Sequence, residues 1–526
     1  MEPVEYDDDD CATTTVRLED DYFDDKKSRI LESSITMNVL SLDKVLQKAG
    51  GFGRFQIYMS VVFSLSFISG SILAYSSTYL IQDPAYLCIK TPGSDYESCT
   101  KDEACEIGSW KIDWYDPNSL DNWINEFNLN CAPPKKTSLL SSMYYCGYAF
   151  GCLFIPRITD KIGRRFPLML CMIFQFPLYM ALLFSKTVEL NTALCFFLGV
   201  TCVGRYNGCF INISEFVHTN YKNHVSTLLL IQDSITTIFV AAYYEFSKNW
   251  LYLQIFGVAI SGLSIIGLWF IPETPEYLYS YHKFSQCKYI CNYIAWFNGR
   301  ELSQTYSFDL EHQLKEINFS IITAGSDYQK SREIDYELSR STKIKNSLKT
   351  GIREFMKDKV LVKNLVVNVL LWMVTICTYN IITIHSNYFP GDQYKSDIVG
   401  ACVELPAYIL GEVIYEKVTG KKLFFFSYMF AAIAGSLMLT NQGNIEMIAS
   451  YSARFGISIT YSGIYLSNEV FPVLYSSTTF GVCNFFAGIT GLITYETILK
   501  LEDQVQICIM IILCMAGGVI AIFLKE

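Results

Sequence analysis

Charged residues are scarce in this chain: Asp, Glu, Lys and Arg make up 17% of its 526 residues, while 51% are hydrophobic. A water-soluble protein of this length rarely has so few charges, which argues against that class. Many windows exceed the roughly 18 apolar residues that cross a bilayer as a helix. These runs are continuous and lack the alternation of a membrane barrel, so the sequence predicts an all-α membrane protein.

The chain also lacks the short motifs of cofactor chemistry. It contains no nucleotide-binding loop and no metal signature. We therefore expect no cofactor and no bound metal. We also expect no nucleic-acid partner and no enzymatic activity.

Twelve membrane spans are predicted, in two groups of six on either side of a long polar stretch. We place them at about 57–80, 138–158, 166–185, 190–212, 225–246, 251–271, 361–385, 397–415, 423–440, 446–466, 478–499 and 505–523. The predicted regions are an acidic N-terminal tail (1–50), an N-terminal six-helix bundle (51–272) that includes a polar loop (81–137), a connecting polar segment (273–360) and a C-terminal six-helix bundle (361–526).

Two of these regions are polar extensions of the bundles. Much of the net charge of −10 lies in the first thirty residues, including Asp7 to Asp10, so we expect a solvated tail. The tail is neither a cleavable signal sequence nor a transit peptide, and the first span then serves as the insertion signal. The connecting segment carries short helical patterns at 284–298 and 308–317, which indicate surface helices joining the halves rather than a separate domain.

The distribution of charge predicts the orientation in the membrane. The loop at 81–137 carries ten acidic residues against five lysines, so it is expected on the non-cytoplasmic side. The basic loops around residues 157–165 and 417–422, and the connecting segment, all fall on the opposite face if there are twelve spans. Both termini should lie on that basic side.

Four of the 18 cysteines lie together in the polar loop, at Cys88, Cys99, Cys105 and Cys131. They allow two disulfides with three alternative pairings. Disulfides would require an oxidising compartment on that side of the membrane. Zinc is the competing interpretation, but the spacing does not support a zinc site.

Two short charged turns between apolar spans indicate an internal repeat. The first is Asp160-Lys161-Ile162-Gly163-Arg164-Arg165, and the second, in the other half, is Glu416-Lys417-Val418-Thr419-Gly420-Lys421-Lys422. An acidic residue, a basic residue, a glycine and a basic pair recur in the same order. This repeat is typical of a membrane protein with two similar halves.

Seven motifs, in order from about residue 50 to residue 500, resemble the major facilitator superfamily and its organic cation/organic anion transporter branch. They are Gly51–Gln56, Trp114–Asp116, Asn125–Cys131, Glu215–Val217, Pro272–Leu278, Val403–Ala407 and Asn468–Pro472. The resemblance implies two six-helix bundles that rock about a central site, with a long non-cytoplasmic loop after the first helix.

The resemblance also implies that the charged turns form ion pairs that close the cytoplasmic face. The expected pairs join Arg164 or Arg165 to Glu215 and Glu273, and Lys421 or Lys422 to Glu469. The alternative is that these charges only anchor loops at the basic membrane face. The residues predicted to act in gating are Asp160, Gly163, Arg164, Arg165, Glu215, Glu273, Glu416, Lys417, Lys421, Lys422 and Glu469.

Several departures from the family pattern predict a weakened latch. Pro156 stands where the family turn opens with glycine, and Glu276 and Ser476 stand where the family carries arginine.

The loop at 81–137, which is commonly glycosylated in surface members, has no Asn-x-Ser/Thr sequon. The two sequons of the chain begin at Asn212, in a span, and Asn318, on the basic side, and we expect both to be unused. Residence in the plasma membrane or in an organellar membrane, including the mitochondrial inner membrane, is therefore left open.

The substrate site is expected near mid-membrane, lined by aromatic side chains and a few polar ones. Ionisable residues within spans are costly and mark function by default, although a structural Arg–Glu pair is the alternative. The resemblance makes Glu404 a binding-cavity acid, and places Thr490 where cation-type members carry aspartate and anion-type members a basic residue. The predicted cavity residues are Tyr145, Tyr148, Arg205, Trp372, Tyr379, Glu404, Arg454, Tyr461 and Thr490.

Two functions follow from these features. The first is a secondary transporter of small organic ions or zwitterions by alternating access, with the lipid bilayer and the solute as its partners. The second is a transport-inactive, transporter-derived subunit of a larger membrane complex, favoured by the altered latch and the missing selectivity charge. A central cavity would favour the first function, and a centre filled by bulky side chains the second.

Overall fold

The computed structural model describes residues 38–90, 95–302, 306–315, 355–386, 393–440 and 443–525. Its contacts divide the chain into two units. One comprises Met1–Gln56, Val217–Thr219 and Pro275–Gly351, and the other Ile57–Phe216, Asn220–Thr274 and Ile352–Glu526. Most of the acidic tail and most of the second half of the connecting segment lie outside the described residues.

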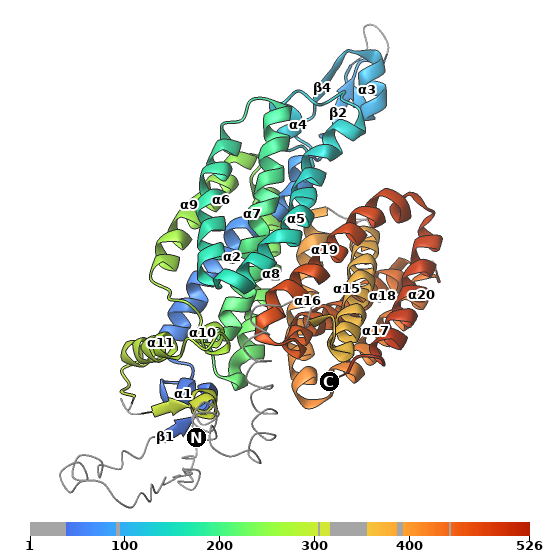
Figure 1. The fold of residues 1–526 in the computed structure, drawn as a ribbon. Helices are drawn as coiled ribbons and strands as arrows, with labels where there is room; N and C mark the ends of the chain where they lie inside the picture. The colour runs from blue at the N-terminus through green and yellow to red at the C-terminus, as the bar shows by residue number, and fades with distance from the viewer. Residues whose placement is uncertain are drawn as a thin grey trace, which may run out of the picture. The chain divides into compact units, whose positions relative to one another are not determined.

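Twelve long helices of the described chain correspond to the twelve predicted spans (Figure 1). The N-terminal bundle consists of α2 (Arg54–Leu80), α5 (Pro134–Ile162), α6 (Arg165–Leu183), α7 (Val188–Glu215), α8 (Thr219–Phe246) and α9 (Trp250–Trp269). The C-terminal bundle consists of α15 (Lys359–Ser386), α16 (Gln393–Lys417), α17 (Gly420–Met438), α18 (Gly443–Leu466), α19 (Val473–Thr497) and α20 (Asp503–Ala521). Among the described residues, nine helices are long and apolar enough to cross a membrane, all of the twelve except α17, α18 and α19. The predicted fold class is confirmed.

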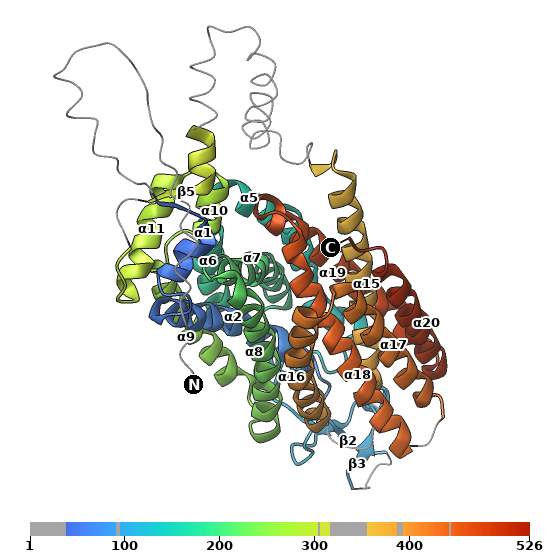
Figure 2. The same cartoon turned by 90° about the horizontal axis from the view of Figure 1, so that it is seen from below.

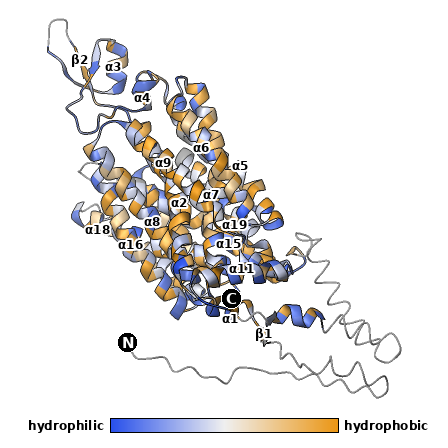
Figure 3. Cartoon of the chain, turned by 90° about the vertical axis from the view of Figure 1, so that its left-hand side faces the viewer, coloured by the Kyte–Doolittle hydropathy of each residue, from blue (hydrophilic) through white to orange (hydrophobic). Residues whose placement is uncertain are grey.

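Hydrophobic side chains cover the outer faces of these helices, as contact with lipid requires. Figure 3 shows hydrophobic residues along α5, α6 and α7. Phe174, Phe256, Ile433 and Ile512 are each at least 47% exposed although they are strongly apolar. In water such a surface would be a large exposed apolar patch, whereas a bilayer covers it.

Helix ends and helix crossings are determined locally by the sequence. Pro134 begins α5, where its missing N–H costs nothing, and the side chain of Thr187 accepts a hydrogen bond from the backbone of α7. Glycines allow α5 and α7 to approach closely. A Cβ on Gly147 would lie 1.9 Å from the carbonyl oxygen of Phe196, and a Cβ on Gly199 would lie 2.0 Å from that of Tyr144.

The polar loop after α2 folds into a small disulfide-linked sheet. Strands β2 (Tyr86–Cys88), β3 (Glu97–Cys99) and β4 (Trp110–Ile112) pair antiparallel in the order β3-β2-β4, and helices α3 (Lys101–Ile107) and α4 (Trp123–Glu126) follow β3 and β4. Of the three alternative pairings, the structure forms Cys88–Cys99 and Cys105–Cys131. All four sulfurs are thereby used, and the competing zinc interpretation does not apply.

The smaller unit packs around one asparagine that follows α11 (Phe284–Phe297), the helix predicted at 284–298. The unit also contains β1 (Asn38–Leu40), paired in parallel with β5 (Tyr306–Phe308), and helices α1 (Leu42–Lys48) and α10 (Pro275–Ser280). The side chain of Asn298 accepts a hydrogen bond from the Phe55 N–H (2.8 Å) and donates to the Ala49 carbonyl (2.9 Å). A Cβ on Gly53 would lie 2.5 Å from the Asn298 side chain. This explains Gly53 of the motif before the first span.

Candidate substrate site and charged-turn network

Arg164 of the first charged turn is fully buried and neutralised within its own bundle. Its Nε donates to Glu215 Oε1 (3.0 Å), and its Nη1 donates to Asp160 Oδ1 (2.7 Å) and to the Thr159 carbonyl (3.1 Å). Glu215 also accepts a hydrogen bond from the Thr274 hydroxyl (2.6 Å). Burial lowers the pKa of Arg164, but the two carboxylates outweigh it and raise the pKa above its usual value, so the guanidinium stays charged.

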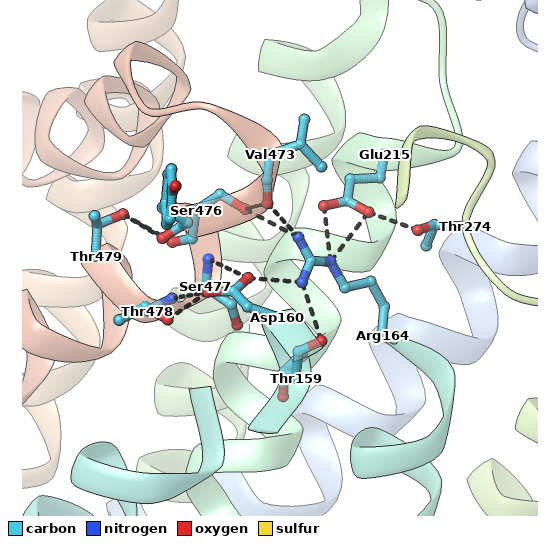
Figure 4. A network of polar contacts seen from close by, with 12 residues as sticks. Thr159, Asp160, Arg164, Glu215, Thr274, Val473, Ser476, Ser477, Thr478 and Thr479 are labelled. Atoms are coloured by element: carbon cyan, nitrogen blue, oxygen red, sulfur yellow. Dashed lines mark hydrogen bonds and ion pairs between the residues drawn. The ribbon is translucent and has the colours of Figure 1, made fainter. Parts of the chain in front are cut away.

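The same network reaches the other bundle at the start of α19 (Figure 4). Arg164 Nη2 donates to the Val473 carbonyl (2.5 Å) and to Ser476 Oγ (3.4 Å). Asp160 accepts hydrogen bonds from the backbone N–H of Thr478 (2.7 Å) and of Ser477 (3.3 Å). Ser476 is one of the departures that together predicted a weakened latch, and beside it the backbone of α19 supplies contacts to the charged turn.

Glu273 supports the turn from the side of its backbone. Its carboxylate accepts hydrogen bonds from the N–H groups of Arg164 (2.9 Å), Arg165 (3.3 Å) and Thr274 (3.0 Å). Burial raises the pKa of Glu273 above its usual range, although these three donors act in the opposite direction. The Arg165 side chain is directed elsewhere, to the carbonyl of Trp269 (2.7 Å).

The second charged turn forms a different set of contacts. Thr419 precedes α17, which begins at Gly420. The predicted pair between Glu469 and Lys421 or Lys422 is not formed, since within the described residues no cation lies at ion-pair distance from Glu469. Burial raises the pKa of Glu469. The contacts of Glu416 are to Asn223 and His224 of the N-terminal bundle.

Glu404 and Arg454 form a buried ion pair in the C-terminal bundle. Arg454 donates to Glu404 Oε1 from Nε at 2.9 Å, and its Nη2 is also 2.9 Å from that oxygen. The Tyr379 hydroxyl donates to the same carboxylate (2.7 Å), and Ser234 Oγ of α8 donates to its other oxygen (2.9 Å). The last bond crosses between the bundles, so the predicted acid Glu404 lies where the two halves meet.

Aromatic side chains fill the space beside this pair. The hydroxyls of Tyr206 and Tyr465 lie 2.5 Å apart across the bundles, and the Tyr148 hydroxyl donates to Asn484 (2.9 Å). Trp372 packs on Tyr465 with ring centroids 4.9 Å apart. Further members of the cluster are Tyr379, Tyr408, Tyr461, Phe210 and Phe480. Four of the predicted cavity residues, Tyr148, Trp372, Tyr379 and Tyr461, belong to this cluster, and in this conformation the side chains of the cluster fill the centre.

Three predicted cavity residues lie apart from this cluster. Arg205 donates to the Phe67 carbonyl (2.5 Å) and to Cys202 Sγ (3.0 Å) within the N-terminal bundle. A cavity of about 10 Å³ beside it has room for about one water molecule. Tyr145 is 42% exposed, and the Thr490 hydroxyl donates to the Phe486 carbonyl of its own helix.

The bundles also contact each other at the end opposite the charged turns. The Tyr79 hydroxyl of α2 donates to Asp397 Oδ2 of α16 (2.5 Å). Tyr394 of α16 stacks on Tyr79, with ring centroids 5.5 Å apart, and its hydroxyl donates to the Pro117 carbonyl of the polar loop (3.4 Å). The two halves are thus joined at both ends and at the centre.

Comparison with known proteins assigns this arrangement to a family. The family model described as Major Facilitator Superfamily matches residues 123–525, which is most of the chain. The chain belongs to the major facilitator superfamily. The membership predicted from the charged turns and the seven motifs is confirmed.

The chain is similar to curated proteins named as organic cation transporters. It is 23% identical over 528 residues to organic cation transporter 1 of Caenorhabditis elegans, covering 92% of this chain and 86% of the relative. It is 22% identical over 493 residues to the organic cation/carnitine transporter 2 of Homo sapiens, covering 84% of this chain and 83% of the relative. None of these comparisons supports a role as a subunit of a larger complex.

Solved structures show the same superfamily fold. The partially occluded, inward-open xylose transporter XylE from E. coli aligns with a TM-score of 0.54 at 11% identity, covering 88% of this chain and 96% of that one. A double tryptophan mutant of XylE aligns with a TM-score of 0.61 at 13% identity, covering 90% of this chain and 97% of that one. At these identities the likeness establishes the fold alone.

One ionisable residue of this superfamily member was missed by the sequence interpretation. Asp233 lies near the middle of α8, within the predicted span 225–246. It accepts hydrogen bonds from the hydroxyls of Tyr75 (2.5 Å) and Ser71 (3.2 Å), and no cation of the described chain lies within ion-pair distance. The rule that singled out Glu404, an ionisable residue inside a span, would have found it.

Proposed function

We propose that this protein is a secondary transporter that moves small organic cations by alternating access. The family and the names of its relatives support transport of organic solutes. The observation that supports a cationic substrate is Asp233, a carboxylate near the middle of α8 that accepts hydrogen bonds from two hydroxyls. Within the described residues no cation lies at ion-pair distance from it, and Arg205 acts on it only over a longer range. Glu404 is neutralised by Arg454, which leaves Asp233 as the acid available to a cation.

The position of Asp233 suits a role at the centre. The next residue, Ser234, donates to Glu404 of the other bundle (2.9 Å), and the two carboxylates are close enough to interact electrostatically. Tyr206 and Tyr461 are also within electrostatic range of Asp233. Aromatic faces attract organic cations by about 0.5–2 kcal/mol each when water is excluded. The acid would fix the charge of the solute, and the rings would pack its apolar part.

In this proposal the two ends open in turn. Opening the charged-turn end requires the bonds from Arg164 and Asp160 to α19 to break, while opening the other end requires the Tyr79–Asp397 bond to break. These bonds do not join unlike charges across the bundles, so each can break at modest cost, whereas the His224–Glu412 contact at the charged-turn end must break as well. The charged turns are proposed to face the cytoplasm or the matrix, and the disulfide-linked loop the oxidising side.

Uptake into proteoliposomes tests the proposal. A labelled quaternary ammonium ion, an aromatic carboxylate and a zwitterion would be compared in vesicles containing the purified full chain. We expect saturable uptake of the cation, reduced about tenfold or more in Asp233→Asn, because a charged contact contributes roughly 1.5–3 kcal/mol. Asp503→Asn, at the exposed start of α20, is the matched control and should transport normally.

The filled centre of this conformation is the outcome that was expected to favour the rival function, whereas the family and its relatives support transport, so experiment must separate the two. If the chain is a transport-inactive subunit, none of the three solute classes is taken up, and native purification recovers a stable complex. If only the carboxylate is taken up, and Asp233→Asn does not change its uptake, the protein is a transporter but its substrate is not an organic cation.

A further inference from the structure

Three side chains with metal-binding atoms meet at the charged-turn end. His224 lies near the start of α8, and Glu412 and Glu416 lie near the end of α16, so the set comes from both bundles (Figure 2 shows these helices). One nitrogen or oxygen from each side chain lies within 4.8 Å of those of the other two. We propose that these side chains bind one divalent transition-metal ion, such as Zn²⁺, which joins the two bundles.

The chemistry of the donors favours a transition metal. His224 Nδ1 contacts Glu412 Oε1 and lies 3.9 Å from Glu416 Oε1. An imidazole with carboxylates is a ligand set for Zn²⁺ and its neighbours, whereas Mg²⁺ and Ca²⁺ prefer oxygen alone. Ligand atoms about 2.0–2.2 Å from a tetrahedral Zn²⁺ lie about 3.3–3.5 Å from one another, so only small side-chain shifts are needed.

The helix itself places the two carboxylates for this purpose. Glu412 and Glu416 are four residues apart on α16 and therefore lie on the same face. Like charges at this spacing repel each other, and a cation between them removes the repulsion. Glu412 is largely buried, with a side chain 10% exposed, while Glu416 is more open at 37%. The pair thus offers one fixed ligand and one that can adjust.

Asn223 supplies a fourth donor. Its Nδ2 lies 3.3 Å from Glu416 Oε1, while its Oδ1 is buried without a hydrogen-bond partner in the described chain. Rotation of the terminal amide exchanges the two atoms. It would bring Oδ1 next to the Glu416 carboxylate, an arrangement that is favourable when a cation lies between the oxygens. The four donors then complete a tetrahedral set.

The site would control one conformational step. Because its ligands come from α8 and α16, the ion binds when the bundles are together at this end and loses half of its ligands when they separate. A ligand that binds one state better than another shifts the population toward it. Zn²⁺ would therefore hold the charged-turn end closed, whatever solute the central site accepts.

Calorimetric titration of the purified full chain with Zn²⁺ tests the site. We expect one ion per chain and a rise in the midpoint of thermal unfolding, with weaker or no response to Mg²⁺ and Ca²⁺. His224→Ala and Glu416→Gln should each weaken binding at least tenfold. His312→Ala, which removes a different one of the five histidines, and the double variant Cys402→Ser/Cys508→Ser, which removes two exposed thiols, should bind as the parent does.

Three outcomes would overturn the proposal: no Zn²⁺ binding, binding unchanged in both ligand variants, or binding lost in the cysteine variant. Binding of Co²⁺ in place of Zn²⁺ shows whether cysteines are the ligands, because thiolate ligation gives an intense near-ultraviolet absorption that nitrogen and oxygen ligands do not give. Glu416→Gln keeps the shape of a partly exposed side chain, so its effect on Zn²⁺ binding tests the site even if His224→Ala does not fold. None of these measurements depends on transport activity.

Discussion

Arg164 donates a hydrogen bond to the carbonyl of Val473, so a buried guanidinium of one bundle is bonded to the first residue of a helix in the other. The two carboxylates that neutralise it, Asp160 and Glu215, belong to its own bundle. The guanidinium therefore has its counter-charges within one half, and the groups of α19 bonded to Arg164 and Asp160 in Figure 4 are backbone and hydroxyl groups. Breaking these bonds separates no ion pair.

Replacing Arg164 should damage both stability and transport. In Arg164→Gln the carboxylates of Asp160 and Glu215 remain buried without a cation, which typically costs about 3–5 kcal/mol. The thermal unfolding midpoint of the purified protein would record the loss. Arg165→Gln is the matched control, since that neighbouring side chain is exposed and makes one bond, to Trp269. Equal effects of the two substitutions would contradict the role given to the Arg164 network.

Glu273 should make stability depend on pH in a defined direction. Its pKa is raised in the folded chain, so the folded state binds the proton more tightly than the unfolded state. The contribution of this group to stability therefore falls as the pH rises from the usual glutamate range through the raised folded value. Unfolding midpoints of the parent and Glu273→Gln should differ most above this window, with the parent gaining on acidification. A difference that does not change with pH would refute this.

Apolar runs were sufficient to predict the twelve helices, because a span in lipid must be both long and internally hydrogen-bonded. The charged turns and motifs could identify the family because each consists of consecutive residues and is therefore visible in the sequence. The Glu404–Arg454 pair was foreseen as one of two alternatives. It could be foreseen because two opposite charges inside spans have few other ways to be neutralised.

Contacts that use backbone groups or join distant helices could not be predicted in this way. Ser476 looked like a lost cation, yet Asp160 accepts hydrogen bonds from the backbone N–H groups of Ser477 and Thr478, which no side-chain pattern reveals. The meeting of His224 with Glu412 depends on the packing of α8 against α16, which are 188 residues apart at that contact. The pairing of the four loop cysteines depended on a sheet whose strands are only three residues long.

The two disulfides should contribute unequally to the stability of the polar loop. Cys105–Cys131 spans 26 residues and Cys88–Cys99 spans 11. In the chain-entropy model these loops correspond to about 3.5 and about 3 kcal/mol. Peptide mapping without reduction would establish the pairing, and hydrogen exchange would compare Cys105→Ser/Cys131→Ser with Cys88→Ser/Cys99→Ser. The first double variant should open the loop more often. Recovery of a Cys88–Cys105 peptide would show that the pairing is wrong.

The Glu404–Arg454 pair should show strong coupling in a double-mutant cycle. Glu404→Gln leaves Arg454 buried and charged, and Arg454→Gln leaves Glu404 in the same condition, so each should cost about 3–5 kcal/mol. The double variant replaces both charges by neutral amides and should be more stable than either single variant, with a coupling energy of up to about 3 kcal/mol. Thermal unfolding in one detergent measures all four proteins, and the Tyr379 hydroxyl, which bonds Glu404 at 2.7 Å, remains in each of them. Additive losses would mean that the two charges are solvated separately.

Uptake by the double variant then distinguishes the roles of the pair. If the pair is only structural, transport recovers together with stability in the double variant, whereas transport stays lost if the pair binds the solute.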